Sequence, residues 1–367
     1  MNSPYGFLLP LLICYSLVFF SANTIEAETK SRKLRELISK NSISSVFVFG
    51  DSTVDPGNND YIGTAFKSNF PPYGEDFFDH IPTGRFSDGR LVTDYLAEYV
   101  GLKETIPPYL DPTLSVEELI TGVSFASAGS GFDPLTAKLS GVIPMQQQLN
   151  YFREYKARIE KAIGEKKAKE LINKASFLIS CGTNDYVVNY FNNPIMQINY
   201  TVSAYQKFLL DNAHQLLKGL IDEGARNIGL VGLPPMGCLP VVITLNSISA
   251  FHRNCIEKYS SAARSYNEGL QEMVASVRRS DINVVYGDIY NPINDMIQNP
   301  SKYGFEDVNT GCCGTGLIEG SFLCNQESPV CPDPSKFIFW DAVHPTQAAY
   351  YHLFKSLRSL ADSFMKG

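Results

Sequence analysis

The sequence predicts an α/β protein whose parallel sheet is covered by helices on both faces. Five short apolar segments alternate with longer amphipathic segments, and this alternation is typical of consecutive βαβ units. The strands are expected at residues 45–49, 122–127, 175–181, 227–232 and 283–286. The sequence shows no internal repeat, low-complexity tract or second hydrophobic core, so we expect a single domain over residues 28–367.

The first strand is the clearest of the expected elements. Val46-Phe47-Val48-Phe49 is a run too short for a helix and rich in strand-forming residues, and Gly50 permits a sharp turn after it. Proline and glycine recur from residue 51 to residue 89, which predicts a long loop that forms part of a binding rim. Apolar residues at helical spacing predict the helices. These are expected at residues 91–100, 146–163, 165–173, 203–223, 250–279, 288–298 and 346–365. Residues 299–336 are expected to be irregular and held by disulfides.

The composition of the 367 residues is that of a globular protein with ample material for a core. Hydrophobic residues make up 44% of the chain and charged residues 19%, and the formal net charge is −7. Binding to nucleic-acid phosphates needs clustered Lys and Arg. The acidic balance therefore argues against a nucleic-acid partner.

The N-terminus has the pattern of a secretory signal peptide at residues 1–27. Residues 7–20 carry no charge, which fits the apolar core of a signal and is shorter than the roughly 20 residues of a membrane span. Cleavage is expected after Ala27, although the only positive charge before the apolar stretch is the amino terminus. An uncleaved anchor is the alternative. If the chain is secreted, the single glycosylation sequon places Asn199 at the surface.

Cysteine usage also indicates export. Of eight cysteines, Cys14 lies in the expected signal, and Cys181 ends an apolar strand, where a buried free thiol is expected. The other six allow 15 pairings. We expect Cys238 to pair with Cys255, and Cys312 and Cys313 to pair with Cys324 and Cys331 in an order left open. A zinc site is the alternative, disfavoured because this cluster contains no histidine and no Cys-x-x-Cys spacing.

Three expected strands end in turns that carry polar or glycine residues. Asp51 and Ser52 follow the first strand, at the edge where open α/β sheets bind ligands. Gly129 and Asn184 follow the second and third strands, where a backbone N–H and a side-chain amide could stabilise an oxyanion. Taken singly, these residues are more often a helix cap, a turn glycine and an Asx-turn. Together they predict a site at one edge of the sheet.

A serine nucleophile needs a neighbouring base, and His344 is the best candidate among the five histidines. Asp341 lies three residues before it, so one tight turn would place its carboxylate beside the imidazole, as in a catalytic triad. Asp211 and His214 have the same spacing, but they lie in the middle of an expected helix, where a solvated surface pair is the better interpretation. The sequence has no Gly-x-Ser-x-Gly, which disfavours the usual α/β-hydrolase arrangement.

Four blocks carrying these residues lie in order along the chain. They are Phe49-Gly50-Asp51-Ser52, residues 122–129, Gly182-Thr183-Asn184-Asp185 and residues 341–345. From about Val46 to the C-terminus the chain resembles the plant GDSL-type esterases and lipases of the SGNH hydrolase superfamily. Thr53 stands where the name-giving motif has Leu, a position without a catalytic role. The resemblance implies a three-layer α/β/α sandwich of flavodoxin-like type with a five-stranded parallel sheet.

The same resemblance implies a secreted carboxylic ester hydrolase that works through an acyl-enzyme. Ser52 would be the nucleophile, His344 the general base and acid, and Asp341 the residue that orients His344. Gly129 and Asn184 would be the oxyanion donors. Lipid or other acyl esters would be the substrates, no cofactor or metal would be needed, and a monomer is expected. The alternatives are a transacylase that uses the same acyl-enzyme and a secreted binding protein on a retired hydrolase scaffold.

Overall fold

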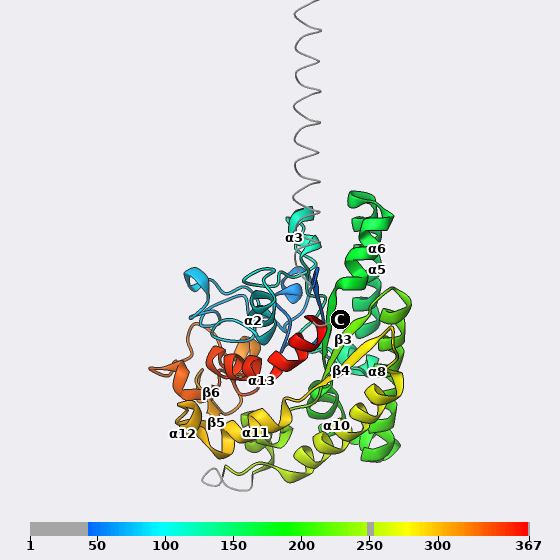
Figure 1. Ribbon diagram of the computed structural model, residues 1–367. Helices are drawn as coiled ribbons and strands as arrows, with labels where there is room; N and C mark the ends of the chain where they lie inside the picture. Colours follow the sequence, from blue (N-terminus) through cyan, green and yellow to red (C-terminus); the bar gives the residue numbers. More distant parts are fainter. Residues whose placement is uncertain (1–42, 248–252, 366–367) are drawn as a thin grey trace, which may run out of the picture. The chain divides into compact units, whose positions relative to one another are not determined.

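The protein is described here by a computed structural model of residues 43–247 and 253–365. A parallel sheet lies among the helices, with its strands in the order β1-β2-β3-β4 (Figure 1). The strands are β1 (Val46–Gly50), β2 (Ser176–Ser180), β3 (Asn227–Val231) and β4 (Asn283–Gly287). They pair without offset, so all four end at the same edge. The expected signal peptide at residues 1–27 lies outside the described residues.

The prediction of a fifth strand at residues 122–127 is wrong, because the main sheet has four strands. The segment runs beside β1 and bonds to it: Phe125 N–H donates to the Val48 carbonyl and Ser127 N–H donates to the Gly50 carbonyl. Only Ser124 makes bridges, one to Val48 and one to Pro108. The side-chain amide of Asn58 donates to the carbonyls of Ser124 and Ala126. The segment is therefore a loop that runs along the edge of β1 and is held on its other side by a side chain.

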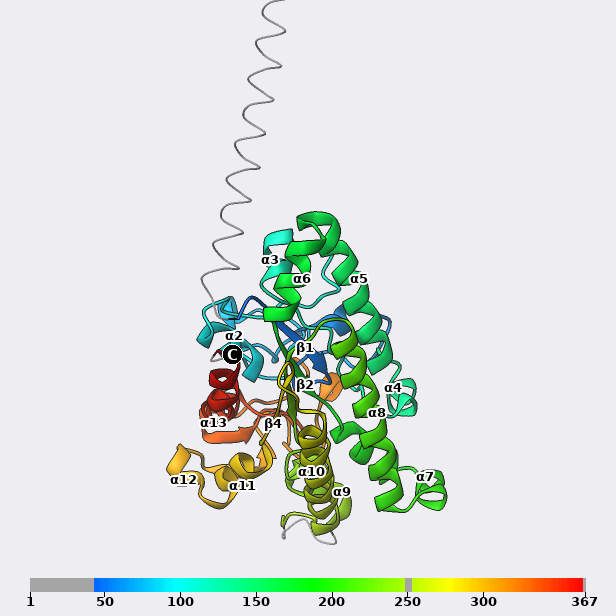
Figure 2. The ribbon, with the colours of Figure 1, turned by 45° about the vertical axis from the view of Figure 1, so that its right-hand side comes forward.

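Helices cover both faces of the sheet, so the predicted α/β architecture with a parallel sheet is confirmed (Figure 2). One face is covered by α2 (Val92–Tyr99), α11 (Tyr290–Gln298) and α13 (Gln347–Met365). The other is covered by α5 (Met145–Ile163), α8 (Val202–Asp222) and α10 (Glu257–Val277). Phe47 of β1 packs on Phe152 of α5, with ring centroids 5.4 Å apart. On the opposite face a Cβ at Gly229 would lie 3.1 Å from Leu360 of α13, so this glycine allows α13 to pack closely against the sheet.

The remaining elements are short or lie outside the two main layers. They are α3 (Val116–Ile120), α4 (Pro134–Ser140), α6 (Glu165–Lys174), the π-helix η3 (Asp185–Tyr190), α7 (Pro194–Asn199), η4 (Met236–Cys238), α9 (Pro240–Asn246) and α12 (Pro300–Tyr303). The helix expected over residues 250–279 begins only at Glu257. A disulfide between Cys238 and Cys255 and a bond from Ile256 N–H to the Gly237 carbonyl hold the chain against η4 just before the helix.

The expectation of an irregular segment over residues 299–336 is wrong in part. It contains β5 (Asp307–Gly311), which pairs in parallel with β6 (Phe337–Phe339) in a second, two-stranded sheet. β5 was missed because Asp-Val-Asn-Thr-Gly has no run of apolar residues, and its middle is only half-buried.

The cysteines form a disulfide framework around this second sheet. The expected pair Cys238–Cys255 is confirmed. Of the remaining four cysteines, whose pairing the sequence left open, Cys312 is bonded to Cys331 and Cys313 to Cys324. Cys181 is a buried free thiol, as expected. The C-terminal disulfides pack with three aromatic residues into a small core: Tyr73, Phe86 and Trp340.

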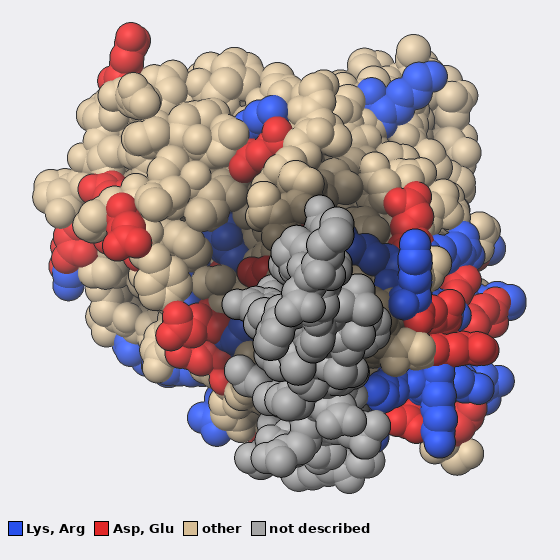
Figure 3. All heavy atoms as spheres, turned by 90° about the horizontal axis from the view of Figure 1, so that it is seen from above, with Lys and Arg blue, Asp and Glu red and all other residues tan. Residues whose placement is uncertain are grey.

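The surface carries charges of both signs. On the face shown in Figure 3, Lys and Arg side chains alternate with Asp and Glu, mainly toward the side where α5 and α6 lie. Within the described ranges, no helix is both long enough and apolar enough to cross a membrane.

Candidate active site

Ser52 lies in a tight turn at the C-terminal end of β1. Gly50 has a φ of 145°, and a Cβ there would lie 1.9 Å from the Ser180 carbonyl oxygen of β2, so only glycine fits this close approach. After it, Asp51 N–H donates to the same Ser180 carbonyl, and the Asp51 carboxylate accepts from the Thr53 N–H at 3.0 Å. These bonds fix the turn, with the Ser52 side chain at the edge where all four strands end.

The structure places His344 beside Ser52 and Asp341 beside His344. The Ser52 Oγ lies 2.8 Å from the His344 Nε2, and the His344 Nδ1 lies 2.7 Å from an Asp341 carboxylate oxygen. Asp341 Oδ1 also accepts the backbone N–H groups of Val343 at 2.8 Å and His344 at 2.7 Å. The tight turn expected from the Asp-x-x-His spacing is therefore present. Because the carboxylate only accepts, it fixes the proton on Nδ1 and leaves Nε2 free to accept from the serine.

Tyr73 is a fourth member of this arrangement, and sequence reasoning missed it. Its hydroxyl donates to Asp341 Oδ2 at 2.7 Å and accepts from the Ser321 N–H at 2.8 Å. Burial, together with the neighbouring Asp341 carboxylate, raises the pKa of Tyr73 well above its ordinary value, so the phenol stays protonated and keeps donating. Tyr73 and Asp341 are 268 positions apart, and nothing in the local pattern around Tyr73 indicates this contact.

The segment after Tyr73 packs against the other side of His344. The Phe86 ring lies 4.8 Å from the imidazole, centroid to centroid, and the Ser87 hydroxyl donates to the Pro345 carbonyl at 3.1 Å. Asp88 accepts the Gln347 N–H at 2.7 Å, next to the first turn of α13. The position of His344 therefore depends on residues 86–88 as well as on Asp341.

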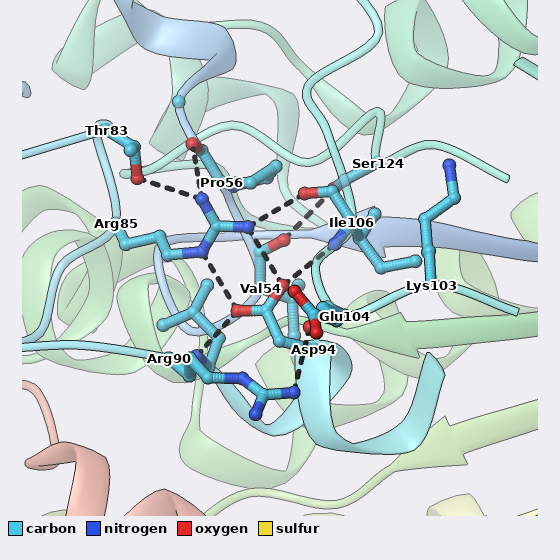
Figure 4. A network of polar contacts seen from close by, with 12 residues as sticks. Val54, Pro56, Thr83, Arg85, Arg90, Asp94, Lys103, Glu104, Ile106 and Ser124 are labelled. Atoms are coloured by element: carbon cyan, nitrogen blue, oxygen red, sulfur yellow. Dashed lines mark hydrogen bonds and ion pairs between the residues drawn. The ribbon is translucent and has the colours of Figure 1, made fainter. Parts of the chain in front are cut away.

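A buried ion pair between Arg85 and Asp94 lies directly before residues 86–88 in the chain (Figure 4). Arg85 contacts Asp94 through two nitrogens, at 2.9 and 2.8 Å, and also donates to the Ile106 carbonyl at 2.9 Å. The Arg85 and Asp94 side chains are almost completely buried. Removing one partner would leave the other charge buried and unpaired, which is costly. Because Arg85 is held in this pair, the chain that follows it is directed toward Phe86.

Gly129 and Asn184 lie near Ser52, as the turn positions predicted. The backbone N–H groups of Ser52 and Gly129 donate to no acceptor within the part of the chain that the structure describes. The Asn184 side-chain amide donates to the Ser130 carbonyl at 2.9 Å, which orients it. Ser52, Gly129, Asn184 and His344 all border one cavity. Two free N–H groups and one oriented amide therefore lie around the serine.

The start of the expected binding rim is a buried scaffold for Gly129. The Asp55 carboxylate accepts the N–H groups of Gly57, Asn58 and Ala128 at 2.8, 2.7 and 2.9 Å. The Asn59 amide donates to the Ala128 carbonyl at 2.9 Å. These bonds join the loop after β1 to the turn that carries Gly129. Residues 51–59 are therefore mostly buried and do not form an exposed rim. Of the segment 51–89, Ser52, Phe66 and Phe86 border the cavity beside the serine.

The other candidate residues lie away from this site. Asp211 and His214 are both exposed on α8, as expected, but the ion pair that Asp211 forms is with Lys207, at 2.6 Å. Asn199 is exposed at the end of α7. Among the described residues, no group of three or more His, Cys, Asp or Glu side chains is placed to hold a metal ion.

Comparisons with known proteins point to one family. The model of the family described as GDSL-like Lipase/Acylhydrolase matches residues 46–357. A GDSL esterase/lipase of Arabidopsis thaliana is 52% identical over 331 residues, 89% of this chain and 88% of its own. A second from the same plant is 39% identical over 351 residues, 94% of this chain and 98% of its own. Among solved structures, a catalytic mutant of Axe2, an acetylxylan esterase from Geobacillus stearothermophilus, aligns with a TM-score of 0.39 and 16% identity, covering 86% of this chain and 94% of its own.

Proposed function

Because this chain belongs to the GDSL-like lipase and acylhydrolase family and is an ester hydrolase, we propose that it cleaves carboxylic esters through an acyl-enzyme on Ser52. The observation that carries the proposal is the continuous line of hydrogen-bonding contacts from Ser52 through His344 to Asp341. Nucleophile, base and orienting acid lie within hydrogen-bond reach of one another, which is the geometry that activates a serine.

The proposed reaction has two halves. His344 Nε2 takes the proton from Ser52 as its Oγ attacks the ester carbonyl carbon, and the carbonyl oxygen becomes negatively charged. The N–H groups of Ser52 and Gly129 and the Asn184 amide stabilise that oxyanion. His344 then gives its proton to the oxygen of the leaving alcohol, which departs. A water molecule, deprotonated by His344, attacks the acyl-enzyme and releases the acid.

Asp341 supports both halves by holding the imidazole in one tautomer and by stabilising the imidazolium that forms. The step sequence uses protons and hydrogen bonds from this chain alone, so the proposal includes no metal or cofactor. We propose lipid or other acyl esters as the substrate class.

We further propose that the enzyme is a secreted monomer with a single domain at residues 28–367, formed after removal of residues 1–27, and glycosylated at Asn199. Three disulfides support export, because such bonds persist in oxidising compartments and are rare in the cytosol. The exposure of Asn199 supports its modification.

The test is hydrolysis of p-nitrophenyl butyrate by the secreted protein and by Ser52→Ala. We expect the variant to lose at least about 10³-fold in kcat with an unchanged midpoint of thermal unfolding, because the nucleophile is removed without disturbing the turn. Ser260→Ala, a buried serine on α10 that does not border the cavity beside Ser52, is the matched control and should keep its rate within tenfold. Full turnover by Ser52→Ala would overturn the assignment.

A further inference from the structure

Ser52 lies between two separate cavities. The first, the outer cleft already described, is bordered by Ser52, Gly129, Asn184, His344, Phe86 and Phe322. The second, here named the α13 cavity, runs from Ser52 between the sheet and α13. Its deeper walls include Leu178, Val231, Ile293, Leu353 and Leu357. Ser52 and Asn184 border both spaces, so a group bound to the serine can reach either one.

The two cavities differ in chemistry. The α13 cavity has polar residues at the strand ends near Ser52, and beyond them its walls are apolar side chains apart from Tyr350. The outer cleft contains the imidazole of His344 and the backbone of Gly129, and neither of these residues borders the α13 cavity.

This asymmetry decides where each part of an ester lies. In the tetrahedral intermediate the former carbonyl carbon carries four groups: the Ser52 oxygen, the oxyanion, the leaving oxygen and the acyl chain. The oxyanion must face Gly129 and Asn184, and the leaving oxygen must face His344 to receive its proton. Gly129 and His344 both direct these groups toward the outer cleft. The α13 cavity is the direction that remains for the acyl chain.

We propose that the α13 cavity binds the acyl chain of the substrate, and that the enzyme selects esters of medium-length, unbranched aliphatic acids. The inference rests on the proposed acyl-enzyme at Ser52. It assigns the alcohol part of the ester to the outer cleft, where exposed edges of Ile318 and Phe322 form the wall.

The dimensions of the cavity set the chain length. Along α13 the cavity is bordered from Tyr350 to Leu357, which are seven positions apart. At the helical rise per residue this is about 10 Å. An extended chain of single bonds advances about 1.2 Å per bond, so roughly eight carbons fill this length. Each methylene buried against these walls should raise kcat/KM by about fourfold, the equivalent of about 0.8 kcal/mol.

Leu178 closes the deep end. A smaller space lies further along the same face of the sheet, bordered by Val46, Leu360 and Phe364. Leu178 borders both this space and the α13 cavity, and it is almost completely buried. Its side chain therefore separates the two, and truncating it would join them into one longer channel.

The experiment is a series of p-nitrophenyl esters of unbranched acids with 2 to 16 carbons, measured as kcat/KM for the whole secreted enzyme. For the parent enzyme we expect a steep rise that levels off near eight carbons. Leu178→Ala should move the plateau to 12 or more carbons, and Val231→Phe, which fills the cavity, should move it to about four. Leu217→Ala, an equally buried leucine on α8 across the sheet, is the matched control and should keep the parent profile.

The readout is the ratio of long-chain to short-chain rates within each variant, so partial unfolding, which scales all rates together, does not affect it. If Leu178→Ala and Val231→Phe hydrolyse the short esters but keep the parent plateau, the acyl chain lies elsewhere and the proposal is wrong. If no ester of the series is cleaved and a fluorophosphonate does not label Ser52, the proposed function itself fails. If the fluorophosphonate labels Ser52 but the two cavity variants keep the parent chain-length plateau, only the assignment of the acyl chain to the α13 cavity is overturned.

Discussion

At the scale of single residues, Asp341 accepts a hydrogen bond that is as short as the contacts within the proposed triad of Ser52, His344 and Asp341. Tyr73 donates to the carboxylate oxygen that also contacts His344 Nδ1, both at 2.7 Å. A donor in this position fixes the carboxylate and hence the plane of the imidazole. Tyr73 is a positioning residue, because it contacts no reacting atom.

Tyr73→Phe should lower kcat by about tenfold and leave KM nearly unchanged, because a hydrogen bond to a charged group contributes about 1.5–3 kcal/mol. The measurement is steady-state hydrolysis of p-nitrophenyl butyrate. Tyr155→Phe is the control: this tyrosine is equally buried, but it donates to the Leu119 carbonyl away from the site. Equal losses of kcat in both variants would mean that Tyr73 acts through folding alone.

Asp51, next to Ser52, should make folding stability depend on pH. Burial raises its pKa from 3.8 to about 6, against the opposing effect of its bonds from Thr53. The folded state therefore holds the proton more tightly than the unfolded chain. Stability contributed by the neutral acid is present below pH 4 and is lost as pH rises to about 6, a change of up to about 3 kcal/mol.

Asp51→Asn removes this titration, so the free energy of unfolding of the variant, relative to the parent, should increase between pH 4 and pH 8. Urea unfolding at several pH values, with disulfides intact, measures the difference. A difference that stays constant with pH would show that the Asp51 carboxyl has the same pKa in the folded and unfolded states.

Ser52, His344 and Asp341 could be predicted because each carries a local signal: a strand-end turn or a three-residue spacing. Tyr73 could not be predicted, because its function comes entirely from contacts with Asp341 and Ser321, far along the chain.

At the scale of elements, the loop after β1 acts as a scaffold for the turn that carries Gly129. Three N–H groups converge on the Asp55 carboxylate, and one belongs to Ala128, the neighbour of Gly129. The position of the Gly129 N–H therefore depends on a side chain that belongs to another loop.

Asp55→Asn should reduce the free energy of unfolding by about 1–3 kcal/mol, since an amide cannot accept from all three donors. It should also lower kcat more than it raises KM, because the Gly129 N–H, the proposed oxyanion donor, shifts. Urea unfolding and steady-state kinetics measure the two effects. Asp111→Asn is the control, since its carboxylate accepts from Thr113 in an exposed turn away from Gly129. A loss of stability with unchanged kcat would show that Asp55 does not position the Gly129 N–H.

The four strands of the main sheet could be predicted, because each is a short, mostly apolar run followed by a turn. Residues 122–127 have the same apolar pattern, yet the Asn58 side chain takes two of their carbonyls, and a periodicity argument does not reveal such a tether. β5 shows the converse. It pairs with β6 through backbone bonds although its own residues are mostly polar.

At the scale of the whole molecule, the site unites segments from both ends of the chain. Ser52 comes from the first strand and His344 from the turn before the last helix, 292 positions apart. The disulfide Cys313–Cys324 lies near this junction, and Ser321, three residues before Cys324, donates to Tyr73. The parallel order of strands brings the strand ends together, and the disulfide-held segment closes the site from the C-terminal side.

The convergence could be predicted from the rule that parallel strands end at one edge. The disulfide order and the α13 cavity could not, because both depend on how helices and loops pack. Gly229 and Gly287 illustrate how such packing is hidden in the sequence: a Cβ at either would lie within 3.3 Å of Leu360 of α13, and neither glycine gives a sequence signal for this contact.

The most direct test of the central claim is mass-spectrometric mapping of the secreted protein after treatment with an alkyl fluorophosphonate. The account predicts one phosphonyl adduct per molecule, on the peptide that contains Ser52, formed in step with the loss of ester hydrolysis and strongly slowed in His344→Ala. An enzyme that loses its hydrolytic activity while the adduct lies on another residue would contradict the account.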